Sequence, residues 1–477
     1  MRIVFAASEA APFIKTGGLG DVAQALPEAL ASYTGNEIML FLPYYKSIKH
    51  NPSIEVEQLG VFETPLAWRR SYTGLMRLKS RRRKLQVYFI DNEQYFGRDQ
   101  IYGCADDGER YAFFCRAILE SLVYLGKTPD VIHCNDWQTA LIPTLLHAFY
   151  GEQLGSAKTV FTIHNIEYQG WADPYFLCDV LGLPGGYEST FEFGGAVNFV
   201  KSAVLTCDAL TTVSRTYANE ICKPYFAHGL SEVITDHAFK VTGIVNGIDM
   251  VGNDPAADRN IAKNYNADTA AEGKAACKAA LQRELGLPEK PDTPVIGLVS
   301  RLVGHKGLDI LCEAMDELMS RDVQLVILGT GDKYYEEKLR EAADKYPDKL
   351  SLNLRFNLAL ASRIYAGSDI YLMPSKSEPC GLSQMMAMRY GTVPIVHETG
   401  GLKDTVIPYN CVTGEGLGFT FSQFTKEDML GATCRALDAY TDHAVWARLM
   451  TNGMTTDFSW NRPAGEYMEL YRSLQNK

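Results

Sequence analysis

The chain has 477 residues, of which 46% are hydrophobic and 22% are charged, and its formal net charge is −11. This length exceeds one ordinary hydrophobic core and predicts two domains. The acidic balance argues against non-specific nucleic-acid binding, and no apolar run approaches the roughly 20 residues that a membrane span needs.

The cysteines and the amino terminus both predict a cytoplasmic protein. The 11 cysteines form no C-x-x-C pair, so neither a disulfide framework nor a zinc site is indicated. Too few apolar residues precede Glu9 for the core of a signal peptide.

The first segment, residues 2–7, is a short apolar run typical of a buried parallel strand, and a glycine loop follows it. This loop, K-T-G-G-L-G-D from Lys15 to Asp21, leads into a helical pattern at residues 22–30. Glycine loops between a strand and a helix commonly bind phosphate, although the spacing here matches neither a P-loop nor G-x-G-x-x-G. A tight turn with an exposed lysine is the alternative.

Strands alternate with helices through the first half, which predicts a parallel sheet covered on both faces. The expected strands are 38–42, 85–90, 131–133, 159–163 and 209–213, with helices near 110–125 and 139–149. Polar residues follow two of these strands, one cluster containing Asp136 and the other His164. A lone histidine after a strand is more often structural, but two clusters at one sheet edge favour a site.

A basic run precedes the strand expected at residues 85–90. It consists of Lys79, Arg81, Arg82, Arg83 and Lys84. We interpret it as a solvated hairpin loop, with a site for a polyanion as the alternative.

The character of the chain changes between residues 241 and 294, where an N-G-I-D turn at Asn246 precedes an alanine-rich and then a proline-rich stretch. We interpret this segment as a crossing between domains. A second series follows, with strands expected at 295–300, 325–328, 351–356, 370–373 and 392–396. The predicted domains are 1–243 and 244–457, with 458–477 as a carboxyl-terminal helix.

Two loops of the second half combine glycine with charge. Arg301 and Lys306 lie on a loop that leaves the first strand of this half, which can place two cations on a pyrophosphate. The loop 375–383, S-K-S-E-P-C-G-L-S, carries Glu378 before a helical pattern and predicts an anion site. A plain helix cap is the alternative for Glu378. No D-x-D or H-x-x-x-H occurs, so no metal site is expected.

The two halves share a short echo, T-G-G-L-G-D at Thr16 and T-G-G-L-K-D at Thr399. Each copy follows a strand of its own half. The echo therefore supports an architecture of two similar sheets.

Taken together, these motifs resemble bacterial glycogen synthase and plant starch synthase, nearly end to end and in the family's order. The motifs are K-T-G-G-L-G-D at Lys15, N-D-W at Asn135, H-N at His164, N-G-I-D at Asn246, S-R-L-x-x-H-K-G-L-D at Ser300 and S-x-x-E-P-C-G-L at Ser375. The resemblance implies an α/β fold of the GT-B class, with two Rossmann-like, doubly wound parallel-sheet domains facing across a deep cleft. It also implies transfer of glucose from ADP-glucose to the non-reducing end of an α-1,4-glucan with retention of configuration.

The resemblance assigns roles to matching positions. Those implied in catalysis are Lys15, His164, Arg301, Lys306 and Glu378. Those implied in donor binding are Lys15, Gly17, Gly18, Asn246, Arg301, Lys306, Phe356, Cys380, Gly381, Leu382 and Ser383. Those implied on the acceptor side are Asp21, Tyr95, Asp136 and Asn165. The family's carboxyl-terminal helix crosses back to the first domain, and no cofactor or metal is implied.

Two positions depart from the family pattern. Phe356 stands where a tyrosine commonly stacks on adenine, and Ser383 where threonine is usual. Phenylalanine keeps the stacking face, but the choice between ADP-glucose and UDP-glucose stays open.

The mechanism and the partners follow as expectations. A double displacement needs a carboxylate nucleophile and a second carboxyl, and no such pair can be assigned, which favours front-face transfer. The expected partners are a nucleotide sugar and a glucan primer, for a monomer or small homo-oligomer. Alternatives are a related transferase with another donor, such as a sucrose-metabolising enzyme, and an inactive glucan-binding paralogue. The latter would be expected to lose Lys15, Glu378 or the pair of Arg301 and Lys306, all of which are present.

Overall fold

The computed structural model describes residues 1–80 and 84–476, and the chain divides into two compact units. The first unit comprises Met1–Asn246 and Trp460–Lys477, and the second comprises Gly247–Ser459. The expected boundaries, after residues 243 and 457, lie within three residues of these positions. Within the basic run, residues 81–83 lie outside the described residues.

The first unit is built on a nine-stranded sheet with the order β12-β11-β7-β6-β1-β2-β5-β4-β3. Its strands are β1 (Arg2–Ala6), β2 (Glu37–Pro43), β3 (Val56–Leu66), β4 (Arg69–Leu78), β5 (Leu85–Asp91), β6 (Val131–Asn135), β7 (Lys158–Ile163), β11 (Ala209–Thr212) and β12 (Val241–Gly243). The seven from β12 to β5 pair in parallel. Their carboxyl ends therefore share one edge, where Glu9, Asp136 and His164 follow β1, β6 and β7.

The central strands form because their apolar runs are buried on both faces. Val4, Phe5, Ile132 and Phe161 are fully buried, as expected for a parallel sheet between helices. The helices of this unit are α1 (Gly18–Ser32), α2 (Lys46–Lys49), α3 (Glu93–Phe96), α4 (Asp107–Tyr124), η1 (Trp137–Thr139), α5 (Ile142–Phe149), α6 (Gly151–Leu154), the π-helix η2 (Leu177–Leu181), α7 (Glu188–Phe191), α8 (Phe199–Thr206), α9 (Arg215–Glu220), α10 (Ser231–Asp236), η3 (Ala238–Lys240) and α19 (Asn461–Gln475). A small sheet joins β8 (Trp171–Ala172), β10 (Ala196–Asn198) and β9 (Glu192–Phe193).

The hairpin of β3 and β4 was not predicted from the sequence. These two strands pair antiparallel at the edge of the sheet, and a bulge interrupts their register between Gln58 and Gly60. Most of the β3 residues are partly or fully exposed, so the hairpin lacks the continuous apolar run that indicated the central strands. The helix expected over 139–149 is also divided, into η1 and α5.

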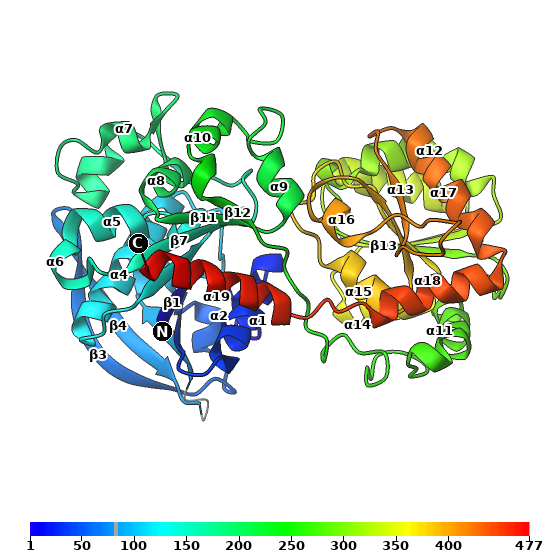
Figure 1. The fold of residues 1–477 in the computed structure, drawn as a ribbon, viewed down its shortest axis with the longest axis horizontal. Helices are drawn as coiled ribbons and strands as arrows, with labels where there is room; N and C mark the ends of the chain where they lie inside the picture. Colours follow the sequence, from blue (N-terminus) through cyan, green and yellow to red (C-terminus); the bar gives the residue numbers. More distant parts are fainter. Residues whose placement is uncertain (81–83, 477) are drawn as a thin grey trace. The chain divides into compact units, whose positions relative to one another are not determined.

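The carboxyl-terminal helix α19 belongs to the first unit and lies beside α1 (Figure 1). The Tyr471 hydroxyl is 2.6 Å from Nδ1 of the buried His133 on β6. Tyr467 and Leu474 on the same helix are also buried. The end of the chain therefore completes the core of the unit in which the chain begins.

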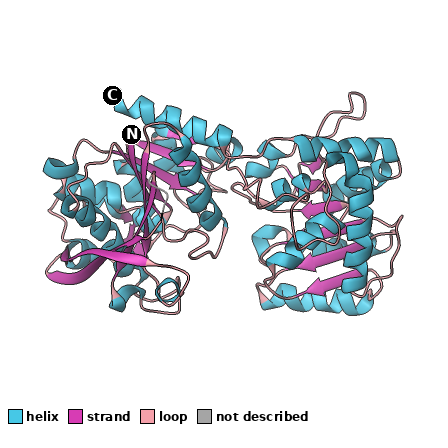
Figure 2. Cartoon of the chain, turned by 90° about the horizontal axis from the view of Figure 1, so that it is seen from below, coloured by secondary structure: helices cyan, strands magenta, loops and turns pink. Residues whose placement is uncertain are grey.

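The second unit contains a six-stranded, entirely parallel sheet with the order β15-β14-β13-β16-β17-β18. Its strands are β13 (Val295–Val299), β14 (Gln324–Leu328), β15 (Leu350–Asn353), β16 (Ile370–Met373), β17 (Val393–His397) and β18 (Phe419–Phe421). Its helices are η4 (Ala267–Thr269), α11 (Ala270–Glu284), η5 (Gly304–Lys306), α12 (Leu308–Met319), α13 (Lys333–Lys345), α14 (Leu358–Gly367), α15 (Ser383–Arg389), α16 (Gly400–Thr405), α17 (Lys426–Tyr440) and α18 (His443–Thr455). Helices cover the strands of this unit on both faces (Figure 2).

One strand of the second unit is shorter than expected. β15 ends at Asn353, because the Arg355 amide folds back to the Asn353 carbonyl at 3.0 Å. Phe356 therefore lies in the following loop. None of the helices in residues 1–80 and 84–476 combines the length and the apolar character that a membrane span requires.

Candidate active site

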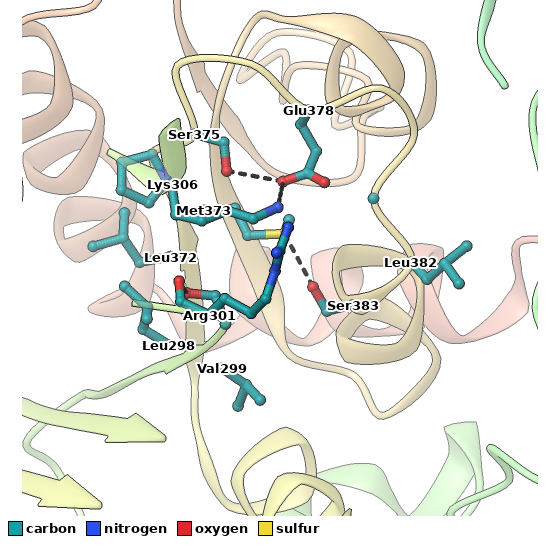
Figure 3. A pocket seen from close by; sticks show the side chains of 13 residues that line it. Leu298, Val299, Arg301, Lys306, Leu372, Met373, Ser375, Glu378, Leu382 and Ser383 are labelled. Atoms are coloured by element: carbon teal, nitrogen blue, oxygen red, sulfur yellow. Dashed lines mark hydrogen bonds and ion pairs between the residues drawn. The ribbon is translucent and has the colours of Figure 1, made fainter. Parts of the chain in front are cut away.

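A pocket lies in the second unit where β13 and β16 end (Figure 3). Its lining joins the two charged loops that the sequence singled out. The residues are Leu298, Val299, Ser300, Arg301, Lys306, Leu372, Met373, Pro374, Ser375, Glu378, Gly381, Leu382 and Ser383. The pocket occupies the position at which parallel α/β sheets bind ligands, beyond the carboxyl ends of the strands.

The central feature of this pocket is an ion pair between Lys306 and Glu378. The Lys306 Nζ lies 2.7 Å from Glu378 Oε2, and the two side chains are 16% and 9% exposed. The Ser375 hydroxyl donates to the same carboxylate oxygen at 3.0 Å. The Glu378 carboxylate therefore makes these contacts within the pocket. It does not cap α15, so the helix-cap alternative is wrong.

A glycine next to Lys306 makes this pairing possible. Gly307 has φ +76, and a Cβ at this position would lie 2.0 Å from the Pro374 carbonyl oxygen. Only glycine permits both the left-handed backbone and this approach. The loop after β13 therefore packs directly on the end of β16, which brings Lys306 to Glu378.

The loop that carries Glu378 is held from behind by α16, the helix that begins with the second copy of the echo. A Cβ on Gly400 would lie 2.0 Å from the Glu378 carbonyl oxygen, and the Gly401 amide donates to that oxygen at 3.1 Å. His397 Nδ1 lies 2.8 Å from the Ser375 carbonyl oxygen. The echo in this unit thus supports the loop of Glu378.

The positive charge of the pocket comes mainly from side chains. Arg301 extends across the pocket toward the loop of Ser383 (Figure 3). The helix that starts at Ser383, α15, spans only seven residues, so its amides add less than the sequence suggested. Arg301 and Lys306 are therefore the groups best placed to bind a diphosphate.

The other donor-side residues are divided between the pocket and its surroundings. Gly381 and Leu382 line the pocket, and the Ser383 hydroxyl lies 3.3 Å from Met373 Sδ. Cys380 is buried. Phe356 does not line the pocket, but it is 80% exposed and follows β15 at the same edge of the sheet.

In the first unit, the glycine loop after β1 is organised by carboxylates. Lys15 Nζ lies 2.7 Å from Asp21 Oδ1, with both side chains about one-third exposed. Gly17 precedes the helix and Gly18 begins it. Lys15 and Asp21, assigned by the resemblance to the donor and acceptor sides, are therefore a contacting pair.

Glu9 is a functional candidate that the sequence analysis missed. Its carboxylate accepts hydrogen bonds from the Thr16 amide and, at 2.8 Å, from the Thr16 hydroxyl. Burial raises the pKa of Glu9, and these bonds offset part of the rise. Its position directly after a buried strand, like that of Asp136, was the available signal.

Asp136 joins the ends of β6 and β7. Its Oδ1 accepts the amides of His164 and Asn165 at 2.7 and 3.4 Å, and its backbone has φ +56, rare outside glycine. Burial raises the pKa of Asp136 to about 7, despite these two hydrogen bonds. The two polar clusters predicted at one sheet edge do meet.

His164 is held as a neutral imidazole. Burial lowers the pKa of His164 to about 3, and its Nε2 lies 2.9 Å from Asn135 Oδ1. The Asn135 amide nitrogen donates to the Ala6 carbonyl at 3.0 Å, which fixes Oδ1 as the acceptor. The imidazole proton therefore resides on Nε2, which leaves Nδ1 as an acceptor for a hydroxyl group.

Asn246 and Tyr95 are both buried, but only Asn246 has a polar atom without a hydrogen-bond partner among the described residues. Asn246 is 5% exposed, and its buried Oδ1 has no hydrogen-bond partner among the described residues. An unsatisfied acceptor of this kind suits a ligand hydroxyl. Tyr95, in contrast, is 1% exposed and its hydroxyl donates to Glu109 at 2.6 Å. Tyr95, which the resemblance assigns to the acceptor side, is therefore buried within the first unit.

Comparisons with known proteins cover both units. The family model described as the starch synthase catalytic domain matches residues 2–236, and that of glycosyl transferases group 1 matches 282–430. A glycogen synthase from Clostridium novyi is 46% identical, with all of both chains covered. Another, from Exiguobacterium sibiricum, is 47% identical over 99% of both chains.

The chain belongs to the glycogen and starch synthase family of glucosyltransferases. A solved structure, the catalytic domain of starch synthase IV from Arabidopsis thaliana bound to ADP and acarbose, matches with a TM-score of 0.91 at 35% identity. It covers 100% of this chain and 99% of that one. The expectation of a GT-B fold with two Rossmann-like domains is thereby confirmed. A sucrose-phosphate synthase from Thermosynechococcus elongatus, with a TM-score of 0.62 at 16% identity, shares the fold.

One group of potential metal ligands exists among the described residues, and it lies outside the two sites above. It consists of Cys104, Asp106 and Asp107. Asp106 pairs with Arg98 and Asp107 with Arg110. These ion pairs already use both carboxylates.

Proposed function

We propose that this enzyme transfers glucose from ADP-glucose to the 4-hydroxyl group at the non-reducing end of an α-1,4-glucan, with retention of configuration. The observation that carries this proposal is the pairing of Lys306 with Glu378 in a pocket that also holds Arg301. A carboxylate suits the hydroxyl groups of a sugar, and two cations suit a diphosphate. Both kinds of group are needed to bind a nucleotide sugar at its reacting end.

Two observations favour an adenine nucleotide. The related Arabidopsis starch synthase structure contains ADP. In this chain, the exposed ring of Phe356 lies at the same sheet edge as the pocket, two strands away from β13, or roughly 10 Å. In a nucleotide whose diphosphate binds Arg301 and Lys306, the base lies at about this distance from the diphosphate. The ring of Phe356 is then available to stack on the base.

The pocket favours transfer on one face of the sugar. Glu378 is the only carboxylate among the residues that line it, and the pair required for double displacement is not present in that lining. In our proposal the acceptor oxygen forms the new bond to the anomeric carbon while the bond from that carbon to the diphosphate breaks. The proton of the acceptor hydroxyl moves to the departing phosphate oxygen, and ADP is released.

Cationic side chains stabilise the charge that develops during this step. Negative charge grows on the diphosphate as the bond breaks, and Arg301 and Lys306 are fixed where it grows. Lys306 also holds Glu378, so one ammonium group links the sugar-binding carboxylate to the leaving group. We propose that no divalent metal is required.

The first unit supplies the acceptor side of the proposal. Asp136, His164 and Asn165 lie together, and the neutral His164 presents a free acceptor at Nδ1. Hydroxyl groups of a glucan can donate to such acceptors without a change of charge. Lys15 and the glycine loop lie at the same sheet edge, after β1.

The test is a direct comparison of donors. Purified enzyme is incubated with a maltooligosaccharide primer and either ADP-glucose or UDP-glucose, and both nucleotide release and primer extension are measured. We expect extension with ADP-glucose, with the new linkages sensitive to an enzyme specific for α-1,4 bonds. Equal or faster extension with UDP-glucose would reject the donor assignment, and no extension with either would reject the proposed function.

A further inference from the structure

An exposed tryptophan stands at the turn between β3 and β4, outside the candidate active site. Trp68 is 75% exposed. Tryptophan carries one of the largest apolar surfaces of any side chain, and a face of it that is exposed can bind a ligand. Neighbouring side chains and the backbone hold this tryptophan in a fixed position.

The indole of Trp68 is held in one orientation. Its Nε1–H donates to Asp179 Oδ1 at 2.8 Å. The guanidinium carbon of Arg69 lies 4.7 Å from the centre of the ring, and Arg69 in turn donates to Asp179 Oδ2 at 2.9 Å and to the Asp179 carbonyl at 2.7 Å. One face of the ring is therefore covered by Arg69, which leaves the other face for a ligand.

The backbone beneath the ring is also specialised. Ala67 has φ +50, which is uncommon for a residue other than glycine. Gly182, which follows η2, packs against it so closely that a Cβ there would lie 2.8 Å from the Ala67 Cα. Strained backbone of this kind tends to occur at functional sites. The turn is thus fixed by contacts with the segment that carries Asp179.

The turn lies at the functional edge of the first unit. β4 pairs antiparallel with β5, and Gly74 is opposite Asp91, the last residue of β5. Arg69 precedes Gly74 by five residues, so the turn extends roughly 16 Å past the carboxyl end of β5. This is the edge at which Asp136 follows β6.

Two contacts link the turn to residues nearer the acceptor side. Arg69 Nη2 is 3.7 Å from Glu109 Oε2, and Glu109 accepts the hydroxyl hydrogen of Tyr95. In the strand order, four steps separate β4 from β6, or about 19 Å. A polymer held at Asp136 and running along this edge would reach Trp68, whereas a two-ring sugar would not.

We infer that Trp68, Arg69 and Asp179 form a remote binding platform for the glucan polymer. This inference rests on the proposed function, because the polymer it binds is the proposed acceptor. A glucose ring presents an apolar face of C–H groups, which stacks on the open face of the indole, and a rim of hydroxyl groups, which meets the guanidinium and the carboxylate. Nucleic acid is disfavoured, because Asp179 and Glu109 would repel its phosphates.

The first experiment separates long from short acceptors. Trp68→Ala is compared with the unaltered enzyme on glycogen and on maltose, with ADP-glucose saturating. Loss of one stacking face predicts a rise of about five- to tenfold in KM for glycogen, and less than twofold for maltose. Trp68→Phe keeps a stacking face and should restore most of the affinity for glycogen.

A matched control is available at the opposite edge of the sheet. Phe239 is 84% exposed and lies in η3, directly before β12, and hence at the amino ends of the parallel strands. Phe239→Ala removes an exposed aromatic ring from the same unit. It should leave KM for glycogen unchanged, and thermal melting of all variants checks their folding.

Direct binding gives a readout independent of turnover. Native gels that contain glycogen, run without donor, should retard the unaltered enzyme and Phe239→Ala more than Trp68→Ala. Equal retardation of Trp68→Ala and the unaltered enzyme, or equal rises in KM for maltose and glycogen, would overturn the inference. An unaltered enzyme that binds glycogen but transfers no glucose would reject the proposed function and leave the platform standing.

Discussion

The two candidate sites of this chain use opposite electrostatic designs. The pocket of the second unit holds charged groups in contact, with Lys306 on Glu378 and Arg301 beside them. In the first unit, beside the ion pair of Lys15 and Asp21, burial instead drives two groups toward neutrality: it raises the pKa of Asp136 to about 7 and lowers that of His164 to about 3. A charged leaving group requires the first design and a neutral hydroxyl acceptor requires the second.

This contrast explains why we expect Arg301 and Lys306 to contribute most to the rate of the reaction. Charge that develops in the transition state is stabilised by groups that are already fixed before the reaction. Neutral acceptors in the first unit orient a hydroxyl group, which is worth less in free energy.

The largest effect is expected for Lys306→Ala. Removing a preorganised charge of this kind typically costs about 3 to 4 kcal/mol, so kcat should fall about a hundred- to a thousandfold while KM for ADP-glucose rises much less. Steady-state kinetics on glycogen give both constants. A change confined to KM would contradict the role of Lys306 at the transition state.

Lys345→Ala is the matched control. Lys345 also pairs with a carboxylate of the second unit, Asp316, at 2.8 Å, but both of these side chains are more than half exposed. An exposed pair contributes little. Its loss should leave kcat and KM within about twofold, given the small worth of such pairs.

The next effect concerns acid stability of the first unit. Burial lowers the pKa of His133 to about 3, below its ordinary value of 6.5, so the unfolded chain takes up this proton first as pH falls. The corresponding stability is complete above pH 6.5 and should decline by about 2 kcal/mol on going to pH 5. Asp136, whose pKa is raised, opposes this trend between about pH 7 and its ordinary range.

The measurement is chemical unfolding at a series of pH values for the unaltered protein and His133→Gln. The variant should be less stable at pH 7, because its contacts with Tyr471 and Thr162 are weakened. Its stability should also depend less steeply on pH between 6.5 and 5. Parallel curves for the two proteins would show that His133 does not remain neutral in the fold.

A smaller effect is expected for Phe356→Ala. Stacking of an aromatic pair is worth about 0.5 to 1.5 kcal/mol, so KM for ADP-glucose should rise about two- to tenfold with little change in kcat. Phe356→Tyr should match the unaltered enzyme. If Phe356→Ala has no effect on KM, the base binds elsewhere at this edge.

The smallest effect is expected for metal removal. Because Arg301 and Lys306 supply the positive charge at the pocket, dialysis against EDTA should leave turnover within the error of the assay. Loss of activity that added Mg²⁺ restores would show that the cations are insufficient. Lys306→Ala, tested with and without Mg²⁺, shows whether a metal ion can replace the missing charge.

The glycine loops were predictable from the sequence, and so were most of the parallel strands, although the two short edge strands β12 and β18 were not. The apolar runs predicted at residues 2–7 and 295–300 are buried over most of their length, so their pattern is strong and local. The motifs around Lys15, Lys306 and Glu378 placed the candidate residues at strand ends, where the structure has them. The β3 and β4 hairpin escaped prediction, because its exposed, bulged strands carry no such pattern.

The tertiary structure alone decided which side chains meet. Lys306 and Glu378 are 72 residues apart and pair only because Gly307 allows two loops to touch. Burial is likewise a property of the folded chain. It leaves the Tyr95 side chain inside the first unit and shifts the pKa values of Asp136 and His164. The hydrogen bond from the Thr16 hydroxyl to Glu9, which holds the glycine loop, also forms only in the fold. Residue type and spacing are local in the sequence, whereas contact and desolvation depend on segments that only the fold brings together.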